Sequence, residues 1–147
     1  MMEMTSSELE VMRVIWTEEE VKSSDIIEIL QQKWSWSPST IKTLLGRLVD
    51  KNLVTSRREG RAYVYQSSVN QKDYHLKMLE SNLNQICQRQ HQSLLRELIK
   101  KLPMTDADSD AWQALLLKKK KETVAAAIPC NCIPGQCQCM KGGHSNV

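Results

Sequence analysis

The 147-residue chain contains no phenylalanine, and aromatic residues make up only 5% of it. Glycine is also scarce, with five residues in all. This scarcity argues against a β-sandwich and against the glycine-rich loops that cradle phosphate in α/β proteins. No run of about 18 apolar residues occurs, so we expect no membrane-spanning helix. The hydrophobic content of 41% is nevertheless sufficient for a core in a domain of ordinary size.

The N-terminus lacks the features of an export signal. Residues 1–4 have no basic segment, and Glu8 and Glu10 interrupt the first apolar stretch. We therefore expect a cytoplasmic protein with no membrane partner. The sequence also has no paired acid and base residues, no phosphate-binding loop and no histidine-rich metal motif of the kinds that enzymes use. It does not predict an enzyme.

Cysteine is distinctive through its placement. Four of the five cysteines fall within ten residues as two Cys-x-Cys pairs separated by a four-residue spacer: Cys130, Cys132, Cys137 and Cys139. Thiolates suit Zn(II) and Cu(I), and Pro134-Gly135 occupies the positions that a type II turn prefers, so the two pairs can fold toward each other. In a reducing compartment this pattern predicts a metal site, and a pair of disulfides is the alternative.

The fifth cysteine, Cys87, lies far from the other four, beside the apolar positions of a helical segment. Free cysteine is among the most frequently buried residue types. We therefore expect Cys87 to be a small buried apolar residue and not a fifth ligand.

Charge is distributed unevenly along the first half of the chain. Residues 1–35 contain eight acidic and three basic residues, whereas residues 36–62 contain two acidic and six basic residues. The basic segment indicates an anionic partner, and a solvated charged surface is the alternative.

Three helices are predicted before and within this basic segment. Residues 5–8, Thr-Ser-Ser-Glu, form a capping box that opens a helix ending near residue 17. An apolar run predicts a second helix over about residues 24–33. Ser37 as N-cap and Pro38 at the first helical position open a third helix, which continues to about Lys51.

The third helix has two distinct faces. Its apolar face consists of Ile41, Leu44, Leu45 and Leu48 and must turn toward the first two helices. The opposite side carries small, hydrogen-bonding or basic residues, which suit a helix inserted into the major groove of DNA. The residues predicted to contact DNA from this helix are Ser39, Thr40, Lys42, Thr43, Gly46 and Arg47.

A basic β-hairpin is predicted over residues 53–65, with its turn at Glu59-Gly60. Three arginines lie near its tip, where they could contact phosphates or a minor groove: Arg57, Arg58 and Arg61. Each basic residue alone could be merely solvated, but their joint placement favours DNA binding. Three helices followed by a basic hairpin form the order of a winged helix-turn-helix.

Residues 36–51 and 59–65 resemble the winged-helix repressors of the BlaI/MecI family. Together with the four-cysteine tail, residues 5–140 resemble the copper-responsive, CopY-type members of that family. This resemblance implies a homodimer that binds double-stranded operator DNA with TACA and TGTA half-sites and controls a copper-homeostasis operon. It also implies that Zn(II) at the cysteines favours DNA binding and that Cu(I) displaces it, with a copper chaperone as a candidate donor.

Between residues 71 and 122 the apolar residues recur at helical spacing in three groups. The groups are Leu76, Leu79, Leu83 and Ile86; Leu94, Leu95, Leu98, Ile99 and Leu102; and Trp112, Leu115 and Leu116. Helices with such narrow apolar faces have little core of their own, so we expect them to pack against a second copy. A helical cap on the winged helix of the same chain is the alternative.

The sequence therefore predicts a mainly α protein in three parts. Residues 1–70 form a winged helix-turn-helix DNA-binding domain, residues 71–122 a helical dimerisation domain, and residues 123–147 a flexible, cysteine-rich metal-sensing tail. Two other functions remain open: a copper-buffering protein or metallochaperone, and a BlaI/MecI-type repressor that does not respond to metal and is controlled by proteolysis.

Overall fold

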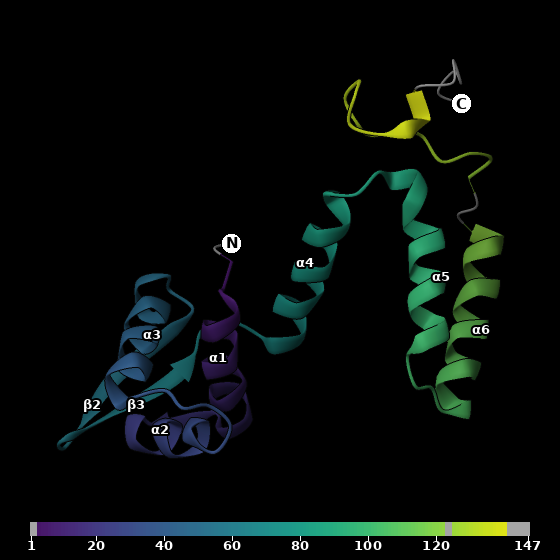
Figure 1. The fold of residues 1–147 in the computed structure, drawn as a ribbon. Coiled ribbons are helices and arrows are strands. Elements are labelled where there is room, and N and C mark those ends of the chain that lie inside the picture. Colours follow the sequence, from purple (N-terminus) through teal and green to yellow (C-terminus); the bar gives the residue numbers. More distant parts are fainter. Residues whose placement is uncertain (1–2, 123–124, 141–147) are drawn as a thin grey trace. The chain divides into compact units, whose positions relative to one another are not determined.

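The structure is a computed structural model that describes residues 3–122 and 125–140, and it is mainly helical (Figure 1). The expected fold class, with a winged helix-turn-helix at the N-terminus, is confirmed. The chain forms two compact units, residues 1–78 and 79–147. The predicted division at residues 70 and 122 stays a prediction, and parts of the predicted tail, residues 123–124 and 141–147, lie outside the described residues.

Helices α1 (Ser6–Glu18) and α3 (Pro38–Asp50) begin where their caps predict. In the capping box of α1 the Glu8 amide donates to Thr5 Oγ1 at 3.2 Å, and the Thr5 amide donates to Glu8 Oε2 at 3.1 Å. The side chain of Ser37 accepts the Thr40 amide at the start of α3. Helix α2 (Ser23–Gln31) lacks a side-chain cap and begins one residue earlier than expected.

The predicted hairpin consists of β2 (Val54–Glu59) and β3 (Ala62–Ser67). Gly60 in its turn has φ of 64°, a conformation that glycine adopts without steric cost. A short strand that the sequence did not predict, β1 (Glu20–Lys22), pairs antiparallel with β3 and gives the strand order β1-β3-β2. This strand brings the end of α1 beside the wing.

The core of the first unit lies between its three helices and the sheet. The predicted apolar face of α3 is buried, and so are the facing residues of α1 and α2: Val11, Met12, Val14, Ile15, Ile26, Leu30, Ile41, Leu44, Leu45 and Leu48. Glu8 is also buried, at 1% exposure, and accepts a hydrogen bond from Lys51 Nζ at 2.6 Å. This ion pair joins the start of α1 to the end of α3.

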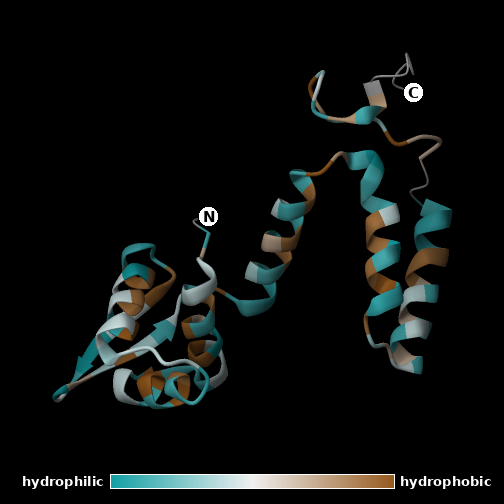
Figure 2. Cartoon of the chain, viewed as in Figure 1, coloured by the Kyte–Doolittle hydropathy of each residue, from teal (hydrophilic) through white to brown (hydrophobic). Residues whose placement is uncertain are grey.

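The three apolar groups after residue 70 form helices, as predicted: α4 (Gln71–Asn84), α5 (His91–Lys101) and α6 (Asp106–Glu122). The short 3-10 helix η1 (Gln88–Gln90) precedes α5. A second 3-10 helix, η2 (Gln138–Met140), lies at the end of the described part of the tail. Apolar side chains on α4, α5 and α6 are exposed, and Figure 2 shows their bands along α5 and α6. Within the described residues, no helix has the length and apolar character needed to cross a membrane.

Candidate metal centre and DNA-binding surface

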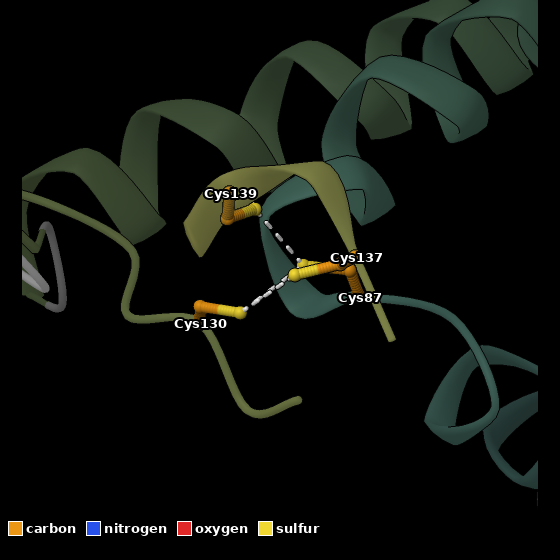
Figure 3. A group of neighbouring side chains, drawn as sticks. All are labelled: Cys87, Cys130, Cys137 and Cys139. Atoms are coloured by element: carbon orange, nitrogen blue, oxygen red, sulfur yellow. Dashed lines mark hydrogen bonds between the residues drawn. The ribbon is translucent and has the colours of Figure 1, made fainter. Parts of the chain in front are cut away.

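Four cysteine sulfur atoms gather in the second unit (Figure 3). The sulfurs of Cys87, Cys130, Cys137 and Cys139 all lie within 4.8 Å of one another. Cys87 Sγ is 3.6 Å from Cys130 Sγ and 3.5 Å from Cys139 Sγ, and Cys130 Sγ is 3.3 Å from Cys137 Sγ. A Zn–S bond of about 2.3 Å corresponds to about 3.8 Å between sulfurs of a tetrahedral site. The cluster, whose cysteines are all free thiols, therefore fits a thiophilic ion in donor type and in size.

The predicted turn in the tail is present and explains how its two cysteine pairs meet. The Gln136 amide donates to the Ile133 carbonyl at 3.1 Å, and Gly135 has φ of 94°. A hydrogen bond across four residues with positive φ at the third is the pattern of a type II turn. The turn folds the segment back on itself, so that Cys137 approaches Cys130.

Cys87 is buried, as expected, at 7% exposure. Its position inside the sulfur cluster was not expected, because it lies 43 positions before Cys130 in the sequence and no local pattern connects the two. Cys132, which the sequence grouped with the tail ligands, lies outside the set of four mutually close sulfurs. The role of the four tail cysteines as metal ligands stays a prediction.

Hydrogen bonds hold the tail against the link between α4 and α5. The Gln88 amide donates to Asn131 Oδ1 at 2.9 Å, and Arg89 Nε donates to the Ile128 carbonyl at 2.8 Å. Neither bond involves a sulfur atom. The segment just before and after Cys130 is therefore positioned beside Cys87 independently of the cluster.

Three thiols of the tail differ in acidity. The Cys132 backbone amide, followed by the Cys137 thiol, stabilises a thiolate at Cys130 and lowers the pKa of Cys130 from 9.0 to about 7. Desolvation and then hydrogen bonds with the thiols of Cys87, Cys137 and Cys130 raise the pKa of Cys132 to about 12. The hydrogen bond with Cys87, and then desolvation, raise the pKa of Cys139 to about 12. Near neutral pH, Cys130 is thus the first of these three thiols to ionise.

The predicted DNA-contacting side of α3 is exposed along its whole length, at Ser39, Thr40, Lys42, Thr43, Gly46 and Arg47. Thr43 Oγ1 donates to the Ser39 carbonyl at 2.9 Å, within the helix. Apart from the backbone of α3 itself, a Cβ built on Gly46 would meet no described atom within 4 Å. Packing within this chain therefore gives no reason for glycine at that position, and the open surface leaves room for a closely approaching partner.

The wing arginines are exposed, but they differ in their contacts. Arg57 forms two hydrogen bonds with the Glu20 carboxylate, at 2.9 and 3.2 Å, and lies 3.4 Å from a Glu59 carboxylate oxygen. These bonds and the charge of Arg57 lower the pKa of Glu20. The sequence did not predict this engagement of Arg57, because it did not predict β1. The DNA contact assigned to Arg57 stays a prediction.

Within the part of the chain that the structure describes, the other two wing arginines form no ion pair. Arg58 Nε donates to the Gly60 carbonyl at 3.2 Å, and its guanidinium carbon lies 5.9 Å from the Tyr63 ring centre. Arg61 is exposed in the turn. Both side chains are at the tip of the hairpin, as expected from the sequence.

Residues 4–118 match the family model described as penicillinase repressor. The chain belongs to the penicillinase repressor family. This confirms the resemblance to the BlaI/MecI family seen in residues 36–51 and 59–65, and membership in a family of repressors agrees with a regulator. The family match ends before the cysteines of the tail, so those cysteines are an addition to the part that the family model describes.

Individual relatives of this penicillinase repressor family member include an uncharacterized 16.5 kDa protein of Latilactobacillus sakei, 36% identical over 139 residues that cover 95% of this chain and 94% of the relative. The methicillin resistance regulatory protein MecI of Staphylococcus aureus is 29% identical over 117 residues, covering 80% of this chain and 95% of MecI. A solution structure of monomeric Bacillus licheniformis BlaI in complex with the blaP half-operator is 37% identical, with a TM-score of 0.45, and covers 50% of this chain and 89% of that chain.

Proposed function

We propose that this protein is a metal-responsive transcriptional repressor of a copper-homeostasis operon. In this proposal a homodimer binds a palindromic operator while Zn(II) occupies the cysteine cluster, and replacement of Zn(II) by Cu(I) releases the DNA. The observation that carries the proposal is the presence, in one chain of the penicillinase repressor family, of a winged helix-turn-helix and a cluster of four sulfur atoms.

The DNA-binding part of the proposal rests on α3 and the wing. Helix α3 presents a continuous exposed side of small and basic residues, while its apolar side is anchored in the core. Short polar groups and arginine at the exposed side suit direct contact with base edges. Arg58 and Arg61, at the hairpin tip, suit contact with phosphates beside the groove.

The proposed homodimer rests on the apolar side chains that α4, α5 and α6 leave exposed. Leu79, Leu98 and Leu115 are each more than half exposed, and others lie beside them on the same helices. Apolar residues repeated along helices are typical of an interface between copies. A two-fold dimer would place two reading helices on two half-sites, which accounts for the palindromic operator that we propose.

The metal part rests on the chemistry of the cluster. Thiolates bind Zn(II) and Cu(I) strongly, and a bound ion supplies cross-links between the segments that provide its ligands. Cys130, with its lowered pKa, supplies the first thiolate near neutral pH. Hydrogen bonds between the tail and the α4–α5 link keep the remaining sulfurs close to it.

A gel-shift titration under anaerobic, reducing conditions tests the proposal. The zinc-loaded protein should shift a labelled duplex with TACA and TGTA half-sites at much lower concentration than a scrambled duplex, and Cu(I) should reverse the shift. A variant with serine at all four tail cysteines should bind the duplex only as the metal-free parent does, and neither Zn(II) nor Cu(I) should change that binding. Release of this variant by Cu(I) would contradict the assignment of the sensor, and equal binding to both duplexes would contradict the operator.

Two substitutions separate base recognition from phosphate contact. Arg47→Ala should weaken binding to the operator more than binding to the scrambled duplex, because Arg47 lies on the exposed side of α3. Arg58→Ala should weaken binding to both and reduce the salt dependence. If both variants bind the operator as the parent does, α3 and the wing are not the reading surface.

The same titration distinguishes the alternatives. A repressor controlled only by proteolysis would bind the duplex with no change on addition of either metal. A copper-buffering protein would bind metal but would not discriminate between the two duplexes.

A further inference from the structure

We infer that Cys87 is a ligand of the metal centre and that it completes a four-thiolate set with Cys130, Cys137 and Cys139. Cys132, the remaining residue of the Cys-x-Cys pairs, is then a bystander in the zinc form. The inference rests on the proposed binding of a thiophilic metal and specifies which residues hold it.

The distances place Cys87 at the centre of the cluster. Of the three sulfur–sulfur contacts described above, two involve Cys87, one to each Cys-x-Cys pair. The third joins Cys130 to Cys137. Since all four sulfurs lie within 4.8 Å of one another, an ion can contact every one of them with little movement of the chain. The thiol of Cys132 hydrogen-bonds with those of Cys87, Cys137 and Cys130, but its sulfur is not a member of the mutually close set of four.

The backbone around Cys87 is held in place without help from a metal. Cys87 precedes η1, and its carbonyl accepts the Gln90 amide at 2.8 Å. On the other side, His91 Nε2 lies 2.7 Å from the Leu83 carbonyl and 2.9 Å from the Ile86 carbonyl. Because both partners are acceptors, this nitrogen carries a proton and donates to them. The histidine thus fixes the segment between the end of α4 and the cysteine.

The tail arrives at this fixed cysteine through bonds of its own, from Gln88 to Asn131 and from Arg89 to Ile128. Cys87 on an ordered link and a tail docked beside it together form a preorganised metal site. A short tail alone would not hold its ligands in place in this way. A bound ion would therefore add a cross-link between the tail and the α4–α5 link to these hydrogen bonds, and loss of Cys87 from its ligands would remove that cross-link.

Cobalt(II) titration of the full-length protein tests the ligand set, because the intensity of sulfur-to-cobalt charge transfer reports the number of bound thiolates. Cys87→Ser should lower that intensity to the level of three thiolates and weaken zinc binding, measured by chelator competition, by more than about 100-fold, since even the loss of an outer-shell partner costs 10- to 100-fold. Cys132→Ser, the matched control, should keep the spectrum and bind zinc within a few-fold of the parent.

The opposite result, with Cys132→Ser impaired and Cys87→Ser like the parent, would overturn the inference and leave the proposed sensor intact. A parent protein that binds neither cobalt nor zinc tightly would instead overturn the proposed function itself. Alkylation of the unmodified, zinc-loaded protein, mapped by mass spectrometry, gives a second measurement that does not depend on a variant folding. Cys132 should be labelled as fast as in the metal-free protein, whereas zinc should protect Cys130, Cys137 and Cys139, and protection of Cys132 by zinc would reject the ligand set.

Discussion

Replacing Lys51 by methionine should destabilise the winged helix-turn-helix by about 3 kcal/mol. Methionine keeps an unbranched apolar side chain but removes the amino group that lies 2.6 Å from the Glu8 carboxylate. The Glu8 side chain is 1% exposed and would remain as a buried charge without its counter-ion. Breaking a buried pair from one side typically costs about 3–5 kcal/mol. The lower end applies because the Lys51 side chain is 21% exposed and because Glu8 keeps its hydrogen bond from the Thr5 amide.

Urea unfolding followed by tryptophan fluorescence measures this loss, because three of the four tryptophans, Trp16, Trp34 and Trp36, lie in residues 1–78. The double variant Glu8→Gln/Lys51→Met is the matched control. It removes both charges, so it should be more stable than Lys51→Met alone. A loss below about 0.5 kcal/mol for Lys51→Met, with no recovery in the double variant, would refute the reasoning, since the pair would then behave like an exposed one.

Three further predictions concern the end of α1, the wing and the cysteine cluster. Glu19→Gly should raise the free energy of unfolding by about 1 kcal/mol in the same urea assay, because Glu19 has φ of 62° and ψ of −60°, a backbone conformation that glycine tolerates better. A loss of stability would show that the Glu19 side chain contributes more to folding than its backbone conformation costs. Glu20→Gln should increase operator affinity about two- to fivefold in gel shifts and steepen the salt dependence of that affinity. The reason is that Arg57 would be freed from the Glu20 carboxylate, which now competes with phosphate. An unchanged affinity would mean that Arg57 does not reach DNA. Zinc affinity, measured by chelator competition, should rise as the pH increases from 6 to 9. Below the pKa of Cys130, about 7, its thiol is protonated, and Cys139, with a pKa of about 12, must also release its proton to bind metal. A zinc affinity that does not change with pH would exclude these thiols as ligands.

The features predicted correctly from the sequence are those specified by neighbouring residues. The capping box at Thr5 and the Ser37-Pro38 pair identify the starts of two helices, because both signals act within one helical turn. The turn at Pro134-Gly135 is equally local. These elements include α3, the proposed reading helix, whose start and exposed side are specified by residues close together in the sequence.

The features that were missed depend on contacts between distant residues. Strand β1 has only three residues, too few to show alternation, and it exists through its pairing with β3, where Val21 lies opposite Tyr65. The engagement of Arg57 by Glu20 follows from that pairing. The inclusion of Cys87 in the sulfur cluster likewise follows from the docking of the tail on the α4–α5 link, for which the sequence offers no pattern.

The open surface beside Gly46 has opposite consequences for the stability of this protein and for its proposed binding to DNA. Glycine inside a helix costs about 1 kcal/mol relative to alanine, and no described neighbour outside α3 requires the space. Alanine at this position should therefore make the isolated protein more stable while holding α3 farther from any DNA it approaches. Stability and the proposed contact of α3 with DNA therefore favour different residues at this position, and selection for thermal resistance alone would weaken the DNA binding that we propose.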